Sequence, residues 1–451
     1  MLQCGSASNL TTRGCLVQSN RYNNAGIGVM CRDGSSRWRS RDQGAFGALG
    51  MDLMLIGFKF KNFRSFLSEQ SFGFSTSSDR MHEATHLMPT GMKAVPRLSK
   101  AAIVFGPNAS GKSNLLAAFA IFRDMVVHST SYSDAQYLER HTPFRFGPSM
   151  SQPTEFEIDV LLDQVRYRYF MSYDSERIRS ERLLVYRTGK SQRWFDRRFD
   201  AVKQSEEWSP FSPSFNGPRE MWRKATRPRA LFLTTAAQLN SEQLAPLAHW
   251  VQQCLEIIFP ADMVDLNRVA SRIQDANFKA RVLKLLHAVD IPIDDLRVGE
   301  QEPKQKCLEF MYARKGWLPI WLNSIFEAAG THRLLGLFCP LLEAIEHGKL
   351  LLIDEFDTSL HPLVARFLIQ LVNDPAISNR GAQLLLTSHN TSLMDLSFLR
   401  RDEIWLAQLN PDHTSQLSPL LLSSPRKHEM VAKNYLRGRY GAVPLIRSAA
   451  G

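Results

Sequence analysis

The chain has 451 residues, with 44% hydrophobic and 22% charged side chains, and its formal net charge is +11. This composition is typical of a globular protein long enough for two or three structural units. It contains no apolar run of about 18 residues or more and no secretion signal, so we expect a cytoplasmic protein with no membrane partner. None of its six cysteines forms a C-x-x-C pair, which argues against a zinc knuckle or a thioredoxin-like site.

Residues 1–50 are rich in Gly, Ser, Asn and Arg and show no apolar periodicity, so we expect them to be disordered. Met51 and Met54 stand just before the first strand candidate. If either is the true start, residues 1–50 are not part of the functional protein. An Arg- and Ser-rich targeting peptide is the other interpretation.

Residues 51–200 begin with strand-type sequence at 55–63. A short, fully apolar run at 101–105 predicts a buried central strand, and 114–127 carries apolar side chains at helical spacing. Three further strand candidates separated by turn-like pairs such as Asp163-Gln164 predict an antiparallel meander. These strands are expected at 155–162, 165–173 and 183–186.

Residues 201–299 are expected to form a loop followed by helices. The segment 200–229 is polar and rich in Pro and Arg, which is typical of a loop. The apolar spacing after it predicts helices near 241–258 and 264–288.

Residues 300–447 contain a strong helix candidate at 331–346, which has a broad apolar face. Pro340 lies inside it and predicts a kink or a break. Short strands are expected before this helix, and buried strands and one helix after it. The strands lie at 296–314, 349–353, 383–387 and 403–409, and the helix at 362–372.

Residues 106–113 read Gly-Pro-Asn-Ala-Ser-Gly-Lys-Ser and match the phosphate-binding pattern G-x-x-x-x-G-K-[ST]. Glycines let such a loop turn its N–H groups toward phosphate, and the next helix adds the positive end of its dipole. An inert glycine-rich turn is the alternative, but the apolar strand before it and the amphipathic helix after it favour ATP binding. We predict that Lys112 reaches the β- and γ-phosphates and that Ser113 ligates Mg²⁺. The candidate nucleotide-binding residues are Gly106, Pro107, Asn108, Ala109, Ser110, Gly111, Lys112, Ser113 and Asn114.

Two further apolar strands end in residues suited to ATP hydrolysis. The strand at 350–353 ends in Asp354 and Glu355, and the one at 384–388 ends in His389. Ligands bind at the carboxyl ends of parallel strands. We predict that Asp354 holds Mg²⁺ through water and that Glu355 polarises the attacking water, while a neutral His389 donates to the γ-phosphate. Taken alone, each could be an ordinary strand end; their order after the phosphate loop favours the catalytic interpretation, with Lys112 as the third catalytic residue.

Together these segments resemble the ABC-type clade of AAA-family ATPases, which includes the SMC, RecF and OLD-family proteins. The resemblance is closer to compact prokaryotic ATPases of abortive-infection and anti-phage systems. It implies an α/β P-loop NTPase fold with a central, mostly parallel sheet, an antiparallel β-subdomain and a helical insertion. The implied head is split into 51–200 and 300–447, with 201–299 as the loop and helical insertion. The resemblance rests on 61–66, 106–113, 354–362, 387–390 and 434–444.

The resemblance also implies that two heads meet head to tail, so that each ATP lies between one phosphate loop and the signature segment of the other head. The best match to that segment is 327–331, in which Gly330 and Thr331 would supply a backbone N–H and a hydroxyl. Related proteins usually have serine where this chain has Ala328, so one hydroxyl is missing. An ordinary helix N-terminus is the alternative interpretation.

Other segments have two open interpretations each. Asp357 and His361 either make contacts across the dimer, as the resemblance implies, or simply form the turn into the next helix. The basic, aromatic-containing stretches 182–198 and 219–229 either contact the nucleic-acid backbone or are solvated hairpin and loop surfaces.

We therefore expect an ATP hydrolase that acts as a nucleotide-driven switch, working as a homodimer or higher oligomer. Because no nuclease motif accompanies the ATPase motifs, the implied role is the ATPase component of a prokaryotic defence system with a separate effector. One alternative is a RecF-like, ATP-dependent DNA-binding repair factor, with nucleic acid as its partner. A second is a non-hydrolysing ATP-binding scaffold, which the alanine at 328 would favour.

Overall fold

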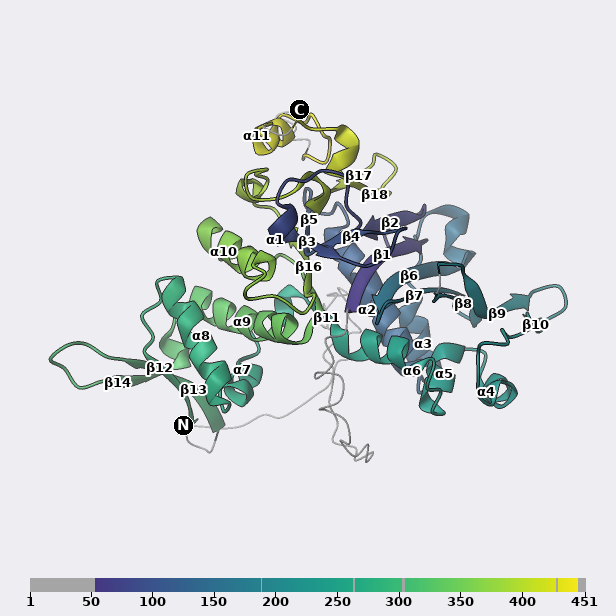
Figure 1. The fold of residues 1–451 in the computed structure, drawn as a ribbon, viewed down its shortest axis with the longest axis horizontal. Coiled ribbons are helices and arrows are strands. Elements are labelled where there is room, and N and C mark those ends of the chain that lie inside the picture. Colours follow the sequence, from purple (N-terminus) through teal and green to yellow (C-terminus); the bar gives the residue numbers. More distant parts are fainter. Residues whose placement is uncertain (1–52, 188, 263, 302–304, 427–428, 445–451) are drawn as a thin grey trace, which may run out of the picture. The chain divides into compact units, whose positions relative to one another are not determined.

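The computed structural model describes residues 53–444 except 188, 263, 302–304 and 427–428. The expectation of disorder for residues 1–50 lies outside the described residues. The described chain is an α/β structure built on one mostly parallel sheet and one antiparallel sheet (Figure 1). No helix among the described residues is both long enough and apolar enough to cross a membrane.

The central sheet has six strands in the order β11-β15-β16-β5-β17-β18. The first five pair in parallel, and only β18 runs antiparallel to its neighbour. This sheet confirms the predicted fold class, because three of the strands expected from apolar runs are its centre. Its strands are β5 (Ala101–Phe105), β11 (Leu255–Ile258), β15 (Leu350–Ile353), β16 (Gln383–Ser388), β17 (Ile404–Leu409) and β18 (Ser415–Pro419).

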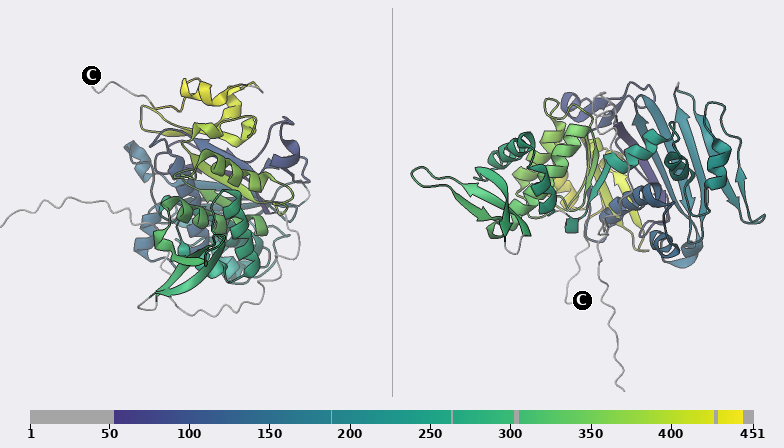
Figure 2. Two further views of the ribbon diagram at one scale, coloured as in Figure 1. Left: turned by 90° about the vertical axis from the view of Figure 1, so that its left-hand side faces the viewer. Right: turned by 90° about the horizontal axis from the view of Figure 1, so that it is seen from below.

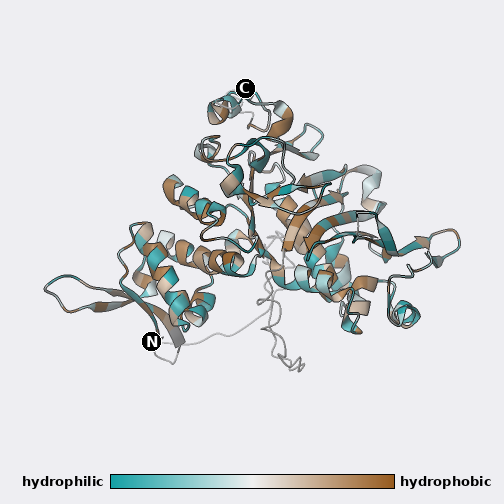
Figure 3. Ribbon diagram, viewed as in Figure 1, coloured by the Kyte–Doolittle hydropathy of each residue, from teal (hydrophilic) through white to brown (hydrophobic). Residues whose placement is uncertain are grey.

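The central sheet is covered on both faces, which explains why β5, β15 and β16 are apolar and buried along their whole length. Successive side chains of β5 point to opposite faces: Ala102 and Val104 join the core that contains α2 (Lys112–His128). Ile103 and Phe105 join the core that contains α9 (Ala329–His347) and α10 (Pro362–Asn373). Figure 3 shows the hydrophobic and hydrophilic bands expected for such helices, which bury only one face.

The second sheet is antiparallel, with the order β10-β9-β8-β7-β6-β1-β2, and confirms the predicted meander (Figure 2, right). Asp163 and Gln164 both have positive φ, 50° and 62°, as the two-residue turn between β6 and β7 requires. The aromatic side chains of this sheet pack on α2, where the rings of Phe58 and Phe119 stack 4.1 Å apart. The strands are β1 (Leu53–Lys61), β2 (Gln70–Gly73), β6 (Thr154–Leu162), β7 (Val165–Tyr173), β8 (Ile178–Tyr186), β9 (Gln192–Asp200) and β10 (Ser205–Trp208).

The expected helix at 241–258 is wrong at its carboxyl end. Its last residues form β11, which pairs in parallel with β15 at the edge of the central sheet. A short segment such as Leu255–Ile258, with three apolar residues and Glu256, fits a strand or a helix equally well, and only the open edge of β15 decides between them. The helices in this part of the chain are α5 (Phe232–Gln238), α6 (Ala245–His249) and the π-helical turn η2 (Trp250–Cys254).

Two other expectations between 200 and 288 are also corrected. The expected loop at 200–229 contains β10 and a short helix, α4 (Arg219–Ala225). The expected helix at 264–288 is two helices, α7 (Leu266–Arg272) and α8 (Ala276–Ala288). The break is at Asp275, whose carboxylate caps α8 by accepting hydrogen bonds from the backbone N–H groups of Asn277 and Phe278.

The region before α9 is a three-stranded sheet, which confirms the strands expected at 296–314 and adds one more. Helix α9 itself runs unbroken through Pro340. Leu337 and Leu341 on either side of it are both buried in the same core, and this packing offsets the lost backbone hydrogen bond. The strands are β12 (Asp295–Gln301), β13 (Gln305–Tyr312) and β14 (Ile320–Asn323).

The remaining elements are short. They are α1 (Glu83–His86), β3 (Leu87–Pro89), β4 (Arg97–Ser99), α3 (Asp134–Arg140) and α11 (Val431–Leu436), with 3-10 turns η1 (Gly147–Ser151), η3 (Pro260–Asp262), η4 (Ser324–Phe326), η5 (Thr391–Leu393), η6 (Arg401–Glu403) and η7 (Leu420–Ser423).

Candidate active site

Three neighbouring strands of the central sheet deliver the sequence-predicted residues to one edge. β15 pairs in parallel with β16, and β16 in parallel with β5, so their carboxyl ends lie together. The loop 106–113 follows β5, Asp354 and Glu355 follow β15, and His389 follows β16. The sheet therefore brings the phosphate-loop, acidic and histidine segments side by side, in the crevice where parallel sheets bind ligands.

The conformation of the loop 106–113 explains why positions 106 and 111 are glycines. A Cβ on Gly106 would lie 2.3 Å from the carbonyl oxygen of Ala407 on β17, so no side chain fits there. Gly111 has a φ of +100° and caps α2, a backbone conformation that side chains disfavour. The strand end, the tight loop and the start of a 17-residue helix give the geometry that holds a phosphate against backbone N–H groups.

Lys112 is the first residue of α2 and is only 6% exposed. Its Nζ donates to the carbonyl oxygens of Gly106 and Pro107, at 2.8 and 2.9 Å. Burial lowers the pKa of Lys112 to about 8, although the negative charges of Asp354 and Glu355 act in the opposite direction. The ammonium is thus held inside the loop and close enough to the acidic segment to interact with it electrostatically.

Thr387 of β16 fixes the two acids at the end of β15. Asp354 is 3% exposed and its Oδ1 accepts a hydrogen bond of 2.6 Å from the Thr387 hydroxyl. The same hydroxyl oxygen accepts a bond of 2.8 Å from the backbone N–H of Glu355. One threonine side chain therefore sets the direction of both residues, a role that its position inside an apolar strand did not reveal.

Glu355 is held in an unfavourable backbone conformation, with a φ of 47°. Arg333, on the second turn of α9, donates from Nη2 to the Glu355 carbonyl oxygen at 2.5 Å. The arginine side chain is largely buried, and burial lowers the pKa of its guanidinium against the opposing charges of Glu355 and Asp357. Thr387 and Arg333 together hold the backbone of Glu355 from both sides.

His389 is exposed at the end of β16. Partial burial lowers the pKa of its imidazole, and the charge of Lys112 lowers it further, while Asp357, Glu355 and Asp354 act in the opposite direction. A lowered pKa keeps the ring neutral at pH 7, the form that can both donate and accept a hydrogen bond.

A tight turn at the amino-terminal end of the described chain lies against the start of α2. Ser65 receives hydrogen bonds from the side chains of Asn114 and Ser415, each 2.8 Å long. Arg64 has a φ of 49° and donates from Nη1 to the Asn114 Oδ1 at 3.3 Å. Of these residues only Asn114 is a predicted nucleotide contact. The positions of the others depend on the end of β1 and the start of β18, which are far apart in the sequence.

The donor set fits a magnesium ion. Ser113 is exposed at the start of α2, and Asp354 keeps its Oδ2 free of protein donors among the described residues. In the part of the chain that the structure describes, no three His, Cys, Asp or Glu side chains are grouped to hold a metal. Mg²⁺ commonly needs only one or two protein ligands when substrate phosphates and water supply the rest.

The signature candidate lies at the start of α9, next to the acidic segment of its own chain. Ala328 is the N-cap and makes no side-chain capping bond, and the Thr331 N–H bonds to its carbonyl oxygen at 3.0 Å. A Cβ on Gly330 would be 3.7 Å from the Ser359 carbonyl oxygen. The contacts of Gly330 and Thr331 described here are therefore with neighbouring turns and not with the loop 106–113.

The acidic segment continues into a turn that ends at α10. His361 is the N-cap of α10, and its Nδ1 accepts a hydrogen bond of 3.3 Å from the Leu363 N–H. Asp357 lies near enough to affect the pKa values of Lys112 and His389. The local geometry is thus that of a turn leading into a helix; contact across a dimer stays a prediction.

The basic stretches differ in how much of their charge is available. In 182–198, Arg197 is 2% exposed and pairs with Glu181 at 2.7 Å, and the Arg187 guanidinium lies 5.3 Å from the centre of the Trp194 ring. In 219–229, Trp222 is buried and cannot stack on a base. Arg197 and both tryptophans are therefore internal structure, whereas most other basic residues of the two stretches are exposed or partly exposed.

The fold and the converging loop, acids and histidine define a P-loop nucleotide-binding head of the ABC type. Over residues 101–395 the sequence matches the family described as "AAA domain, putative AbiEii toxin, Type IV TA system", and the chain belongs to this family. This confirms the predicted relationship to AAA-family proteins of abortive-infection systems.

Two solved structures are similar to the chain. The SMC head domain from Thermotoga maritima is 14% identical, with a TM-score of 0.39 over 81% of this chain and 98% of that one. The Smc head domain from Pyrococcus furiosus, bound to the C-terminal domain of ScpA, is 11% identical, with a TM-score of 0.41 over 82% of this chain and 98% of that one. Among curated proteins, none matches the sequence.

Proposed function

We propose that this protein binds and hydrolyses MgATP at the edge formed by β5, β15 and β16. The observation that carries the proposal is the convergence of Lys112, the pair Asp354 and Glu355, and His389 on three adjacent parallel strands. Burial lowers the pKa values of Lys112 and His389, and the charges of Asp354, Glu355 and Asp357 act against this lowering at both residues, which supports one shared site.

Each residue has a separate task in this proposal. The backbone N–H groups of 106–113 and Lys112 bind the phosphates. Hydrogen bonds with Arg64 and Ser65 hold the side chain of Asn114 next to this loop. Ser113, and Asp354 through water, would hold Mg²⁺, which would supply positive charge to stabilise the transferring phosphoryl group. Glu355 accepts the proton of the attacking water, and neutral His389 donates a hydrogen bond toward the γ-phosphate.

We further propose that ATP closes two heads into a homodimer or higher oligomer, with Gly330 and Thr331 of each head completing the site of the other. The bond from Arg333 on α9 to the Glu355 carbonyl oxygen supports coupling between this segment and the proposed hydrolytic residues. The closed form would present a surface to a separate effector in a cytoplasmic defence system. The energy for closure comes from phosphate contacts made only in the closed state.

A non-hydrolysing ATP-binding scaffold is the second candidate function. Ala328 favours it, because the residue at the N-cap of α9 has no hydroxyl to offer a γ-phosphate. The two functions differ in turnover alone, since both require ATP binding by the loop 106–113.

The test is MgATP turnover by the full chain beside Lys112→Ala and Glu355→Gln, with Lys59→Ala and Glu69→Gln as matched changes in an exposed ion pair. We expect Lys112→Ala to lose ATP binding, and Glu355→Gln to keep binding while turnover falls about a hundredfold or more. Full turnover by Glu355→Gln would reject the proposed base. ATP binding without turnover in the parent would favour the scaffold, and stimulation by DNA would favour a RecF-like repair factor.

A further inference from the structure

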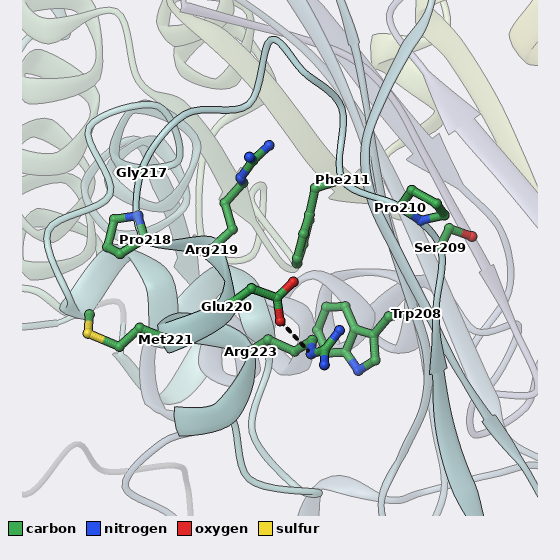
Figure 4. Close-up of a pocket in the computed structure, with 10 residues that line it drawn as sticks. All are labelled: Trp208, Ser209, Pro210, Phe211, Gly217, Pro218, Arg219, Glu220, Met221 and Arg223. Carbon is green, nitrogen blue, oxygen red and sulfur yellow. Dashed lines mark ion pairs between the residues drawn. The ribbon is translucent and has the colours of Figure 1, made fainter.

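An open cavity of about 710 Å³ lies where strand β10 leads toward α4, in a part of the fold that the proposed ATP site does not use (Figure 4). Its volume is in the range of ligand sites, about 300–1,000 Å³. It is lined by Trp208, Ser209, Pro210, Phe211, Gly217, Pro218, Arg219, Glu220, Met221 and Arg223.

Two aromatic rings form one wall of this cavity and are held by packing beneath them. Trp208 and Phe211 are half-buried, and both rest on the fully buried Phe232, with ring centroids 5.1 and 5.8 Å away. Their own rings are 5.8 Å apart. Aromatic faces that are fixed from below and partly open above provide a surface on which a planar ring can stack.

Arg219 supplies a positive group beside these rings. Its Nη1 donates to the Ser212 carbonyl oxygen at 2.9 Å, and the guanidinium carbon lies 5.8 Å from the centre of the Phe211 ring. In Figure 4 the guanidinium extends along the side of Phe211 opposite Trp208. Among the described residues its other N–H groups have no acceptor, so they remain available to an anion.

The acid in the lining does not compensate Arg219. Glu220 is the one carboxylate among the lining residues, and it pairs with Arg223 at 3.2 Å (Figure 4). The segment 217–229 as a whole has five basic residues against that single acid. A ligand for this cavity should therefore combine a planar ring with negative charge.

We propose that this cavity binds one nucleotide unit. Because the rings of Trp208 and Phe211 are tilted by 49° to each other, the base stacks on one ring and packs with its edge against the other, while Arg219 binds the phosphate. The unit is either a free mononucleotide or one nucleotide of a single strand whose neighbouring nucleotides lie outside the cavity. This site is separate from the loop 106–113, so the proposal does not depend on the proposed ATP reaction.

The test measures binding of fluorescein-labelled oligothymidylate of about 12 nucleotides to the full chain by fluorescence anisotropy, at about 50 mM salt. The variants are Arg219→Ala and Phe211→Leu, with Arg227→Ala as the matched control. Arg227 is exposed in the same segment and carries the same charge, but it does not line the cavity. Thermal unfolding of each variant checks that it folds, and Lys112→Ala removes any contribution of the loop 106–113.

We expect Arg219→Ala and Phe211→Leu each to weaken binding about tenfold, while Arg227→Ala changes it by less than about threefold. Lys112→Ala should leave binding unchanged. Competition by thymidine monophosphate at an affinity close to that of the oligomer would identify a free nucleotide as the ligand; its failure to compete would identify the strand. Equal losses for Arg219→Ala and Arg227→Ala would show a diffuse charge effect and overturn the proposal, as would absence of binding by both probes. If Phe211→Leu fails to fold, the comparison of the two arginines decides.

Discussion

The hydroxyl of Thr387 is the smallest feature on which the candidate site depends. It donates to Asp354 and accepts from the backbone N–H of Glu355, so that a residue on β16 orients both acids at the end of β15. Its surroundings are buried, where an unmade hydrogen bond costs more than in water. A single side chain on β16 therefore sets the direction of both candidate catalytic acids.

We predict that Thr387→Val, which keeps the shape but removes the hydroxyl, lowers the free energy of unfolding by about 1–3 kcal/mol. Turnover should fall about tenfold or more, because Asp354 and Glu355 lose their shared partner. Urea unfolding and phosphate release measure the two effects. Thr387→Ser keeps the hydroxyl and should restore most of the turnover; a Ser variant as impaired as the Val variant would contradict the proposed role.

The lowered pKa of Lys112 predicts that ATP binding is coupled to proton uptake. Near pH 8 about half of the nucleotide-free protein has a neutral Lys112, since its pKa is about 8. Phosphate oxygens next to the amine favour its charged form and raise its pKa, so a proton is taken up as ATP binds. Uptake should be small at pH 6.5, where Lys112 is already charged, and affinity should fall as the pH rises above 8.

Isothermal titration calorimetry in buffers of different ionisation enthalpy measures this proton uptake directly. The expected value at pH 8 is a fraction of one proton per site. A full chain that releases protons at pH 8, or that shows no change between pH 6.5 and pH 8, would contradict the assignment of the buried amine to phosphate binding.

At the scale of the elements, α9 connects the signature candidate to the end of β15, where the candidate catalytic acids lie. Its first turn contains Gly330 and Thr331, and its second turn contains Arg333, which bonds to the Glu355 carbonyl. A displacement of α9 would therefore shift the backbone of Glu355. The unfavourable φ of 47° at Glu355 persists only because surrounding contacts hold it. The hydrogen bond from Arg333 therefore links the position of α9 to the backbone conformation of Glu355.

We predict that Arg333→Met lowers turnover about tenfold while ATP affinity changes by less than about threefold, because the loop 106–113 is untouched. Arg281→Met is the matched control: Arg281 is on α8, and its one ion pair among the described residues is with Glu346, at 3.5 Å. Steady-state kinetics and equilibrium ATP binding separate the two effects. An equal loss of affinity and turnover in Arg333→Met would point to general disruption of the fold.

At the scale of the whole molecule, the proposed switch depends on two heads sharing each ATP. Gly330 is well placed for this, because a Cβ there would meet nothing closer than the Ser359 carbonyl at 3.7 Å. Its backbone φ is also not in the left-handed region. A larger residue can therefore be introduced without straining the single head, which makes the dimer testable by itself.

We predict that Gly330→Asp folds and binds ATP but does not dimerise with it, because the added carboxylate would face the γ-phosphate of the other head. Ala328→Ser should act in the opposite direction and strengthen the ATP-dependent dimer. Analytical ultracentrifugation in the Glu355→Gln background, with and without MgATP, measures both. ATP-dependent dimerisation of Gly330→Asp equal to the parent would exclude 327–331 from the interface.

The local sequence was sufficient to predict the phosphate loop, the Asp-Glu strand, the His-ended strand and the α/β class. Each depends on residues close together in the chain: a glycine-rich turn between strand and helix, or an apolar run followed by a polar end. The same locality explains the errors, since 255–258 is a strand only because β15 offers an edge, and Pro340 is tolerated only because its neighbours are buried.

The sequence by itself thus determined on which kinds of element the loop 106–113, the pair Asp354 and Glu355, and His389 lie. Only the tertiary structure decided that Thr387 and Arg333 hold Glu355, and that Trp208, Phe211 and Arg219 line one cavity while Trp222 is buried. The physical reason is that backbone conformation and phosphate recognition follow from neighbouring residues. Hydrogen-bond partners and burial depend instead on segments that meet only when the sheets are assembled.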